Sequence, residues 1–462
     1  MIFREIEWRT PQAAFAPFSD EPFSVLLSGG QGAAEAGWSA IAAFPSRVLE
    51  ARGGRVLIDG APSALDPFAA LGALYRERED EAGLAWPFDI AAPPMAAGLY
   101  GYVGYEMGAA LEPLAAGPPS PFPLPDMTIG AYDGVALFNR RARRAFLSAR
   151  SETAAARLES ALGKDEPARA ALPVFHGPVS NFTAAGYEEA VAAAIELIRD
   201  GAIFQVNLAQ QLSVETAEKV DPFALYQRLA AGDAPFAAFL QYKDGVIVSN
   251  SPERFFKVVS AGKVSRIVAE PIKGTSMRGA TAGEDRALAE ALLADPKERA
   301  ENVMIADLTR NDLSRICKDY SIREDAVCAL ESFAGVHHLV SRISGVLCDD
   351  ATPVDALRAL FPCGSITGAP KIEAMRTIAA FEPSGRGPYC GAIGYIDDYG
   401  RADFSVVIRT MIVTREGRGA RVVLPVGGGV TLRSDPRREY EETLIKARGM
   451  LAALGIKDAA AA

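Results

Sequence analysis

Pro271-Ile272-Lys273-Gly274-Thr275 is the stretch that most narrows the choice of fold and chemistry for this chain. It places a lysine amine between a stiff apolar dipeptide and a glycine. A lysine can act as a covalent nucleophile when its surroundings keep part of it neutral. Most lysines are solvated surface charges, so the interpretation depends on neighbouring motifs. Ser251-Pro252-Glu253-Arg254-Phe255 precedes the lysine, and two spaced glutamate pairs follow it.

Composition and charge exclude several classes of protein. The chain has 462 residues, of which 49% are hydrophobic and 23% charged, as is typical of a large globular protein. This length predicts two or three domains, or one elaborate α/β unit. The net charge of −10 argues against a general nucleic-acid surface but permits a local basic pocket for a small dianion. No apolar run approaches the roughly 20 residues that span a bilayer, so we predict no membrane association.

The cysteines and the first residues indicate a compartment. The five cysteines are an odd number and show no C-x-x-C spacing, which argues against a disulfide framework or a structural zinc site. The start of the chain lacks the long apolar core and small-residue cleavage site of a signal peptide. We therefore expect a cytoplasmic protein.

Changes in composition predict four regions. These are a first region of short strands and turns at 1–150, a connection at 151–180, a larger region at 181–455 and a tail at 456–462. The clearest predicted helices span 284–294, 297–313, 353–360 and 437–454, and the clearest predicted strands span 203–208, 246–249 and 267–269. Strands and helices occur in separate blocks more than in strict alternation, which favours a mixed α+β fold.

Two glutamate pairs share one pattern. Glu298 and Glu301, and likewise Glu439 and Glu442, follow an Asp-Pro dipeptide that suits a helix start, so each pair falls on one face of a first turn. Such glutamates can simply complement the helix dipole. Two pairs on two helix N-termini could instead converge on one Mg²⁺ ion, which prefers oxygen ligands and bridges to anionic substrates.

Glycine-rich turns and one arginine are candidates for binding an anion. Gly364-Ser365-Ile366-Thr367-Gly368-Ala369-Pro370-Lys371 and Val426-Gly427-Gly428-Gly429-Val430 can expose backbone N–H groups to a carboxylate or phosphate, although neither is a Walker A loop. Arg409 lies in a strand-like run at 406–410, where it needs either a structural salt bridge or a carboxylate ligand. His337 and His338 are expected to be structural histidines, because no other metal ligands stand near them in sequence.

Together these motifs resemble the chorismate-utilising enzymes. Three stretches are specific in combination: Phe204-Gln205-Val206-Asn207-Leu208, the run from Ser251 to Phe255, and Asp307-Leu308-Thr309-Arg310-Asn311-Asp312-Leu313. The turn at 364–371 and Gly391-Ala392-Ile393-Gly394-Tyr395 extend the match. The resemblance implies large antiparallel β-sheets packed as a sandwich with helices on the outside. It makes 1–150 a component I N-terminal region and 181–455 the chorismate-binding catalytic region.

Within this family the chain is similar to component I of the aminodeoxychorismate synthases. Lys273 stands where anthranilate synthases typically carry alanine, and Gln205 stands where isochorismate and salicylate synthases place a water-activating lysine. The resemblance implies amination of chorismate at C4 to 4-amino-4-deoxychorismate, on the route to 4-aminobenzoate and folate. Ammonia would come from a separate glutamine amidotransferase subunit, since no nucleophile elbow or glutaminase cysteine motif is present.

The family mechanism assigns roles to two residues. Neutral Lys273 would attack C2 of the ring while Glu253, as general acid, protonates the departing C4 hydroxyl. Ammonia would then add at C4 and expel the lysine. Burial favours the uncharged form of both groups.

The same resemblance implies the remaining site residues. Mg²⁺ would be held by Glu298, Glu301, Glu439 and Glu442, directly or through water. Substrate carboxylates and the ring would be bound by Gln205, Thr275, His338, Thr367, Gly368, Tyr389, Arg409, Gly427, Gly428, Gly429 and Lys446. Some relatives bind tryptophan in the N-terminal part, which here matches Ser28, Trp38, Ser39, Ala40, Ile41, Pro235, Phe236 and Ala237.

Two other functions are open at this point. Anthranilate synthase component I would form anthranilate and release pyruvate, but an obligatory amine at 273 should obstruct direct amination at C2. A non-catalytic regulator that binds chorismate or tryptophan would not need Lys273, Glu253 and all four glutamates.

Overall fold

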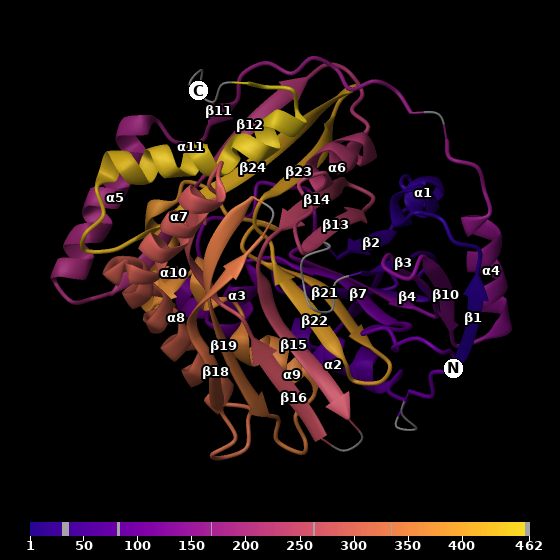
Figure 1. Ribbon diagram of the computed structural model, residues 1–462. Coiled ribbons are helices and arrows are strands. Elements are labelled where there is room, and N and C mark those ends of the chain that lie inside the picture. Colours follow the sequence, from indigo (N-terminus) through magenta and orange to yellow (C-terminus); the bar gives the residue numbers. More distant parts are fainter. Residues whose placement is uncertain (30–36, 81–83, 168, 262–263, 334, 458–462) are drawn as a thin grey trace.

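Two large antiparallel β-sheets, packed face to face, dominate the computed structural model, which describes residues 1–29, 37–80, 84–167, 169–261, 264–333 and 335–457 (Figure 1). Within those residues each sheet has twelve strands, and all the strand pairs are antiparallel. The predicted α+β sandwich with outer helices is therefore confirmed.

Both sheets contain strands from the two ends of the chain. The first sheet runs in the order β1 (Ile2–Ile6), β10 (Arg144–Ala149), β9 (Gly134–Asn139), β3 (Trp38–Ala42), β2 (Val25–Ser28), β13 (Phe236–Gln241), β14 (Gly245–Ser251), β23 (Thr410–Glu416), β24 (Gly419–Val430), β12 (Gln205–Thr216) and β11 (Val179–Ser180), with β20 (Gly368–Ala369) paired to β12. The second runs in the order β17 (Ile272–Met277), β19 (Val336–Val346), β16 (Val264–Ala269), β15 (Arg254–Ala261), β22 (Ala402–Val406), β21 (Ala392–Asp397), β7 (Gly98–Val103), β8 (Met127–Tyr132), β4 (Arg47–Arg52), β5 (Arg55–Ile58) and β6 (Ala61–Ser63), with β18 (Arg323–Ser332) paired to β19.

Helices cover the outer faces of both sheets (Figure 1). Those associated with the first sheet are α1 (Pro11–Phe15), α4 (Glu152–Leu162), α5 (Ala184–Arg199), α6 (Pro222–Ala230), α10 (Lys371–Phe381) and α11 (Pro436–Ala453). Those associated with the second are α2 (Pro67–Arg76), α7 (Ala282–Ala294), α8 (Pro296–Ser314) and α9 (Pro353–Leu360). The short elements are α3 (Met107–Leu111), η1 (Ala16–Phe18), η2 (Pro113–Ala115) and η3 (Gly364–Ile366). Over the described part of the chain, none of the helices has the length and apolar character that crossing a bilayer requires.

The helix starts follow from the sequence. Asp295 and Asp435 cap α8 and α11: the Asp295 carboxylate accepts the backbone N–H of Lys297 at 2.8 Å, and the Asp435 carboxylate accepts that of Arg438 at 3.0 Å. A proline follows each cap at the first helical position, where its missing N–H does no harm. The helices predicted near 297–313 and 437–454 are therefore confirmed, and both start where the Asp-Pro pattern places them.

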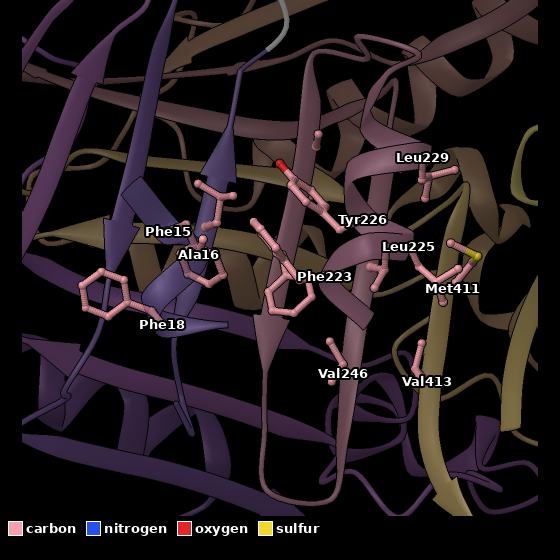
Figure 2. Close-up of a cluster of buried hydrophobic side chains, with 14 of the residues drawn as sticks. Phe15, Ala16, Phe18, Phe223, Leu225, Tyr226, Leu229, Val246, Met411 and Val413 are labelled. Atoms are coloured by element: carbon pink, nitrogen blue, oxygen red, sulfur yellow. The ribbon is translucent and has the colours of Figure 1, made fainter. Parts of the chain in front are cut away.

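The hydrophobic core is layered. Side chains of both sheets, such as Tyr100 from β7 and Ile247 from β14, meet in the layer between them. Outside the first sheet, aromatic residues of α1 and α6 pack on β13, as Figure 2 shows for Phe15 and Phe223. Because both faces of the central strands are covered, β7, β8 and β21 are buried along their whole length.

The chain passes from one sheet to the other at two points that matter for the site. β14 belongs to the first sheet and β15 to the second, so Glu253 lies at the first crossing. β22 and β23 also belong to different sheets, and residues 407–409 connect them. The predicted strand over 406–410 is therefore wrong at 407–409. Arg409 has a φ of 53°, a left-handed backbone conformation that favours glycine, because the chain turns there to change sheets.

The aromatic cluster around α6 gives a first prediction. The ring of Phe223 is fully buried and lies 5.3 Å from that of Phe239 and 5.4 Å from that of Phe15. Phe223→Ala should lower the free energy of unfolding by about 3–5 kcal/mol, because it leaves a cavity. Phe204→Ala is the matched control: this ring is 62% exposed, and its loss should change stability by less than about 0.5 kcal/mol. Urea unfolding followed by circular dichroism measures both, and equal losses would contradict this view of the core.

Candidate active site

Lys273 lies on β17 at an irregularity in the pairing of that strand. The register between β17 and β19 shifts between Ile272 and Thr275, and Gly274 has a φ of 90°, which a residue with a side chain rarely adopts. Such a bulge changes the direction in which side chains point. The Lys273 amine lies 3.3 Å from the position that a Cβ on Gly429 would occupy. The bulge thus brings an amine of the second sheet against a glycine strand of the first.

Gln205 meets Lys273 at the same place. The side-chain nitrogen of Gln205 is 2.5 Å from the Cβ position at Gly429, so a larger residue there would collide with it. Gln205 is buried, and within the described structure its side-chain oxygen has no hydrogen-bond partner. A buried acceptor without a partner is costly, and a bound molecule could satisfy it.

Glu253 lies beside the lysine strand. Its carboxylate accepts a long hydrogen bond of 3.5 Å from the backbone N–H of Ile272, the residue before Lys273. The side chain is buried, and this burial raises the pKa of Glu253, whereas the Ser365 hydroxyl and the charge of Lys273 act to lower it. The carboxyl is thereby shifted towards the protonated form that a general acid needs.

The two predicted glutamate pairs, on α8 and α11, lie within electrostatic reach of each other. Burial raises the pKa of Glu298, and the charge of Glu442 adds to that rise. Burial likewise raises the pKa of Glu301, and the charge of Glu439 adds to it. The charge of Lys273 opposes both shifts, so the amine lies within electrostatic reach of these carboxylates.

Two observations indicate that the glutamates could bind a hard cation. Within the described residues, one oxygen of Glu301 and one of Glu439 are buried without a hydrogen-bond partner, although Lys297 lies 3.8 Å from the former. A Cβ on Gly428 would lie 3.1 Å from the unpartnered Glu439 oxygen and 3.9 Å from a Glu442 oxygen, so the glycine leaves open space beside both. No three acidic, histidine or cysteine side chains of the described structure are grouped closely enough to hold a metal by themselves. Mg²⁺ typically needs only one or two carboxylates, with water and substrate oxygens completing its shell.

A basic side chain lies beside the same glycine as these glutamates: the Lys446 amine is 3.9 Å from the Cβ position at Gly428. Lys446 donates to the carbonyl of Gly427 at 2.9 Å and pairs with Glu442 at 2.7 Å. Burial lowers the pKa of Lys446, and Glu442 opposes this shift. For Glu442, burial raises the pKa, but Lys446, with the charges of Lys273 and Lys297, more than offsets it, so the net shift of the pKa is downward.

Arg409 and Tyr389 are two further hydrogen-bond donors near the glycine strand. Arg409 donates one N–H to the carbonyl of Lys446 at 2.8 Å, so its hydrogen-bond partner is a carbonyl and not the carboxylate of a structural salt bridge. A guanidinium has five N–H donors, so others can serve an anionic ligand. The hydroxyl of Tyr389 lies 3.1 Å from the Cβ position at Gly427, which places it at the same strand.

The remaining predicted residues lie near these groups. The Thr275 hydroxyl and the Nδ1 atom of His338 are 2.9 Å apart, which joins β17 to β19. Thr367 is fully buried, and its hydroxyl donates to the carbonyl of Cys363 at 2.9 Å. Gly368 pairs with Val206 in β12, one residue after Gln205.

Sequence reasoning missed three residues that support the site. Asn302 is buried in α8 and donates to the carbonyls of Lys273 at 3.3 Å and Leu339 at 2.9 Å, which fixes the lysine strand to the helix that carries Glu298 and Glu301. The Ser365 hydroxyl acts to lower the pKa of Glu253. Arg386 binds two backbone carbonyls beneath the site. The position of Asn302 directly after Glu301 could have indicated its role from the sequence. The roles of Ser365 and Arg386 could not be seen there, because their partners are distant in sequence.

A separate cavity of about 80 Å³ lies between the sheets, away from these groups. Of the residues predicted to bind tryptophan, Ser28, Trp38, Pro235, Phe236 and Ala237 line it. Ser39, Ala40 and Ile41 continue β3, where Ala40 and Ile41 belong to different hydrophobic clusters. Tryptophan binding itself stays a prediction.

Comparison with known proteins agrees with this geometry. The model of the family described as chorismate binding enzyme matches residues 34–452. Anthranilate synthase component 1 of Synechocystis is 36% identical over an alignment that covers 97% of this chain and 95% of the relative. Aminodeoxychorismate synthase component 1 of Klebsiella aerogenes is 33% identical, with 96% and 97% covered. Aminodeoxychorismate synthase of Streptomyces griseus is 38% identical over 86% of this chain and 55% of the longer relative.

Solved structures show the same architecture. Anthranilate synthase component I of Streptococcus pneumoniae superposes with a TM-score of 0.78 at 30% identity, covering 90% of this chain and 92% of the other. The isochorismate synthase MenF of Escherichia coli, at 17% identity and a TM-score of 0.73, shares the fold. The chain belongs to the chorismate-binding enzyme family. Its relatives carry two different names at similar identity, so the particular reaction has to be argued from the site.

The buried histidine gives a testable consequence. Burial lowers the pKa of His338 to about 4, and the charges of Arg409 and His337 add to this shift while a backbone bond to Gly274 opposes it. The unfolded chain takes up this proton near pH 6.5 and the folded chain near 4. The stability contributed by neutral His338 is therefore complete above pH 6.5 and is lost as the pH falls towards 4. His338→Gln should flatten that part of the unfolding profile, by roughly 3 kcal/mol at most.

The exposed His176 provides the control for that measurement. His176→Gln removes an imidazole that folding does not bury, so the pH dependence of urea unfolding should match the wild type. If the unfolding free energy of His338→Gln also followed the wild type between pH 4 and 6.5, the conclusion that His338 is buried in its neutral form would be wrong.

Proposed function

We propose that this protein aminates chorismate at C4 to give 4-amino-4-deoxychorismate. The observation that supports this reaction most directly is the position of Lys273. Its amine lies against Gly429 and Gln205, and its charge acts on Glu253 and on the facing glutamates. An amine in that place would obstruct direct amination at C2 but is suited to form a bond with the ring.

The residues of the site can be given consecutive roles. Lys273 forms a bond from its nitrogen to C2 of chorismate as the ring double bonds shift and the C4–O bond breaks. Glu253 gives its proton to the departing hydroxyl, which leaves as water. Ammonia then forms the C4–N bond and gives up one proton, which restores the Glu253 carboxyl, while the double bonds shift back and the C2–N bond to Lys273 breaks. The net change replaces the C4 hydroxyl by an amino group and returns the lysine unchanged.

Groups beside the glycine strand would bind the anionic substrate. Arg409, Lys446 and Tyr389 would hold a carboxylate through charged and neutral hydrogen bonds. Glu298, Glu301, Glu439 and Glu442 would hold Mg²⁺, directly or through water. When bound there, the ion supplies positive charge for a second substrate carboxylate, which the surrounding carboxylates would otherwise repel.

Ammonia requires a source outside the described site. Two of the relatives are named as component 1 of their enzymes. We propose that a glutamine amidotransferase subunit supplies ammonia to this chain, and that free ammonium salts can replace it at high concentration.

Identification of the product tests the proposed function. Purified protein with chorismate, Mg²⁺ and an ammonium salt should give 4-amino-4-deoxychorismate, detected by mass spectrometry, and no pyruvate. Anthranilate with one equivalent of pyruvate would instead establish the anthranilate synthase reaction, which the names of several relatives favour. Chorismate binding without turnover, even with a glutaminase partner, would favour a regulator.

The lysine role has its own test. Lys273→Ala should lower the rate of 4-amino-4-deoxychorismate formation at least about a thousandfold, because the nucleophile is lost, while chorismate still binds. Lys318→Ala is the matched control, since this lysine pairs with Asp349 at the surface and should keep full activity. Substantial amination by Lys273→Ala at high ammonia would contradict covalent catalysis.

The metal role predicts a difference between two glutamates of one helix. Glu439→Gln should weaken Mg²⁺ binding roughly 10- to 100-fold, measured by calorimetry and by the Mg²⁺ concentration that gives half-maximal rate. Glu441→Gln on the same helix should leave both values unchanged, because Glu441 is exposed and pairs with Arg437 at 3.1 Å. Equal effects of the two changes would argue against a metal site at Glu439.

A further inference from the structure

Glu106 reaches from the first 150 residues into a segment that carries a site residue. It directly precedes α3, and one of its carboxylate oxygens accepts the backbone N–H groups of Arg386 at 2.6 Å and Gly387 at 3.1 Å. The backbone N–H of Tyr105 donates to the carbonyl of Gly387 at 2.8 Å, so two neighbouring residues hold the same segment. Tyr389 follows two residues later.

A contribution to stability does not explain why the Glu106 carboxyl is buried at this position. Its second oxygen is buried, with no hydrogen-bond partner in the described part of the chain. Burial raises the pKa of Glu106 to about 7, although the bonds from Gly387 and Arg386 lower it. A buried acid with an unsatisfied oxygen destabilises the folded state. Its two backbone hydrogen bonds therefore fix the geometry of a segment at the expense of stability.

The segment has little freedom to adopt another position. A Cβ on Gly385 would lie 2.6 Å from the bonded oxygen of Glu106 and 2.7 Å from the carbonyl of Pro118. Gly387 has a φ of 61°, which favours glycine. The carboxylate thus fits closely against a backbone that only glycine can form at these two places.

The side chain of Arg386 links this segment to two backbone segments that line the site. Its guanidinium is 1% exposed and donates to the carbonyl of Ile366 at 2.9 Å and that of Asn207 at 2.6 Å. It is neutralised by Glu382 through bonds of 2.9 and 2.6 Å. Ile366 directly precedes Thr367, and Asn207 lies two residues after Gln205. One buried side chain therefore holds two of the strands and turns that line the site.

The same segment positions Tyr389. The backbone N–H of Tyr389 donates to the carbonyl of Arg386 at 3.2 Å, and its hydroxyl lies close to Gly427. The guanidinium of Arg386 also lies 4.6 Å from the ring centre of Tyr105, next to Glu106. A shift of the Arg386 backbone would therefore displace groups on three elements of the site together.

We propose that Glu106 is a positioning residue for the chorismate site and acts through the Arg386 backbone on Thr367, Gln205 and Tyr389. This inference rests on the proposed function only for the identity of the substrate, chorismate. What matters is the reach of an acceptor oxygen to two N–H groups, and not the negative charge of the carboxylate.

Three substitutions separate reach from charge. Glu106→Gln keeps an oxygen at the same distance and removes the charge, so the KM for chorismate should stay within about threefold of the wild type. Glu106→Asp keeps the charge but shortens the side chain by one methylene, and Glu106→Ala removes the acceptor. Both should raise the KM, and the Kd measured by calorimetry, roughly tenfold or more, with a smaller change in kcat. The assay follows chorismate consumption, so its outcome does not depend on which product forms.

Asp398→Asn is the matched control for loss of stability. Asp398 is a buried acid that also joins the first 150 residues to a later part of the chain, through Arg78 at 2.9 Å and Arg150 at 2.8 Å. Its substitution should lower Tm without raising the KM for chorismate. An unchanged KM in Glu106→Asp and Glu106→Ala would overturn the proposal. So would Glu106→Gln behaving like Glu106→Ala, or a KM rise in Asp398→Asn as large as theirs.

Discussion

The need to give every buried polar group a partner shapes this protein around the line where its two sheets meet. Glu253 and Arg409 lie there because the backbone changes sheets at those residues, and the strand carrying Lys273 is distorted beside them. A continuous strand would direct such side chains into an apolar layer, where an unpaired charge is very costly. Beside the crossings, Gly429 leaves room for the side chains of Lys273 and Gln205. The irregular backbone is thus the condition for a polar site inside an otherwise hydrophobic sandwich.

Within the site, the charges of the lysines and the glutamates are paired with one another only in part. Lys446 and Glu442 form a close pair, and Lys273 moderates the carboxylates around it. Oxygens of Glu301, Glu439 and Gln205 have no partner among the described residues. A protein optimised for stability would not keep such atoms buried, because each of them weakens the fold. Such unpartnered oxygens are available to a bound molecule or ion.

Local signals were sufficient for much of the architecture. The Asp-Pro dipeptides fixed the starts of α8 and α11, and apolar periodicity located the main helices and several strands. Of the residues that the resemblance assigns to the site, Lys273 and Gln205 meet at Gly429, a proximity that no spacing in the sequence could have established. The strand predicted through Arg409 was wrong because a change of sheet leaves no mark in apolar pattern. Glu106 and Arg386 went unnoticed because their partners lie up to 281 positions away in the chain. Such contacts depend on the topology of the fold, which no short stretch of a single sequence indicates.

The mixed origin of both sheets has a consequence for how the protein can be made. β2 from the start of the chain pairs with β13, and β7 pairs with β21 from near the end. During synthesis, β2 therefore lacks its partner β13 until residues 236–241 have been made, and β7 lacks its partner β21 until residues 392–397 have been made. Long-range pairing of this kind slows folding and exposes intermediates to aggregation. Evolution could not easily add or remove the first 150 residues as a module, because each sheet would be cut through its middle and left with an open edge.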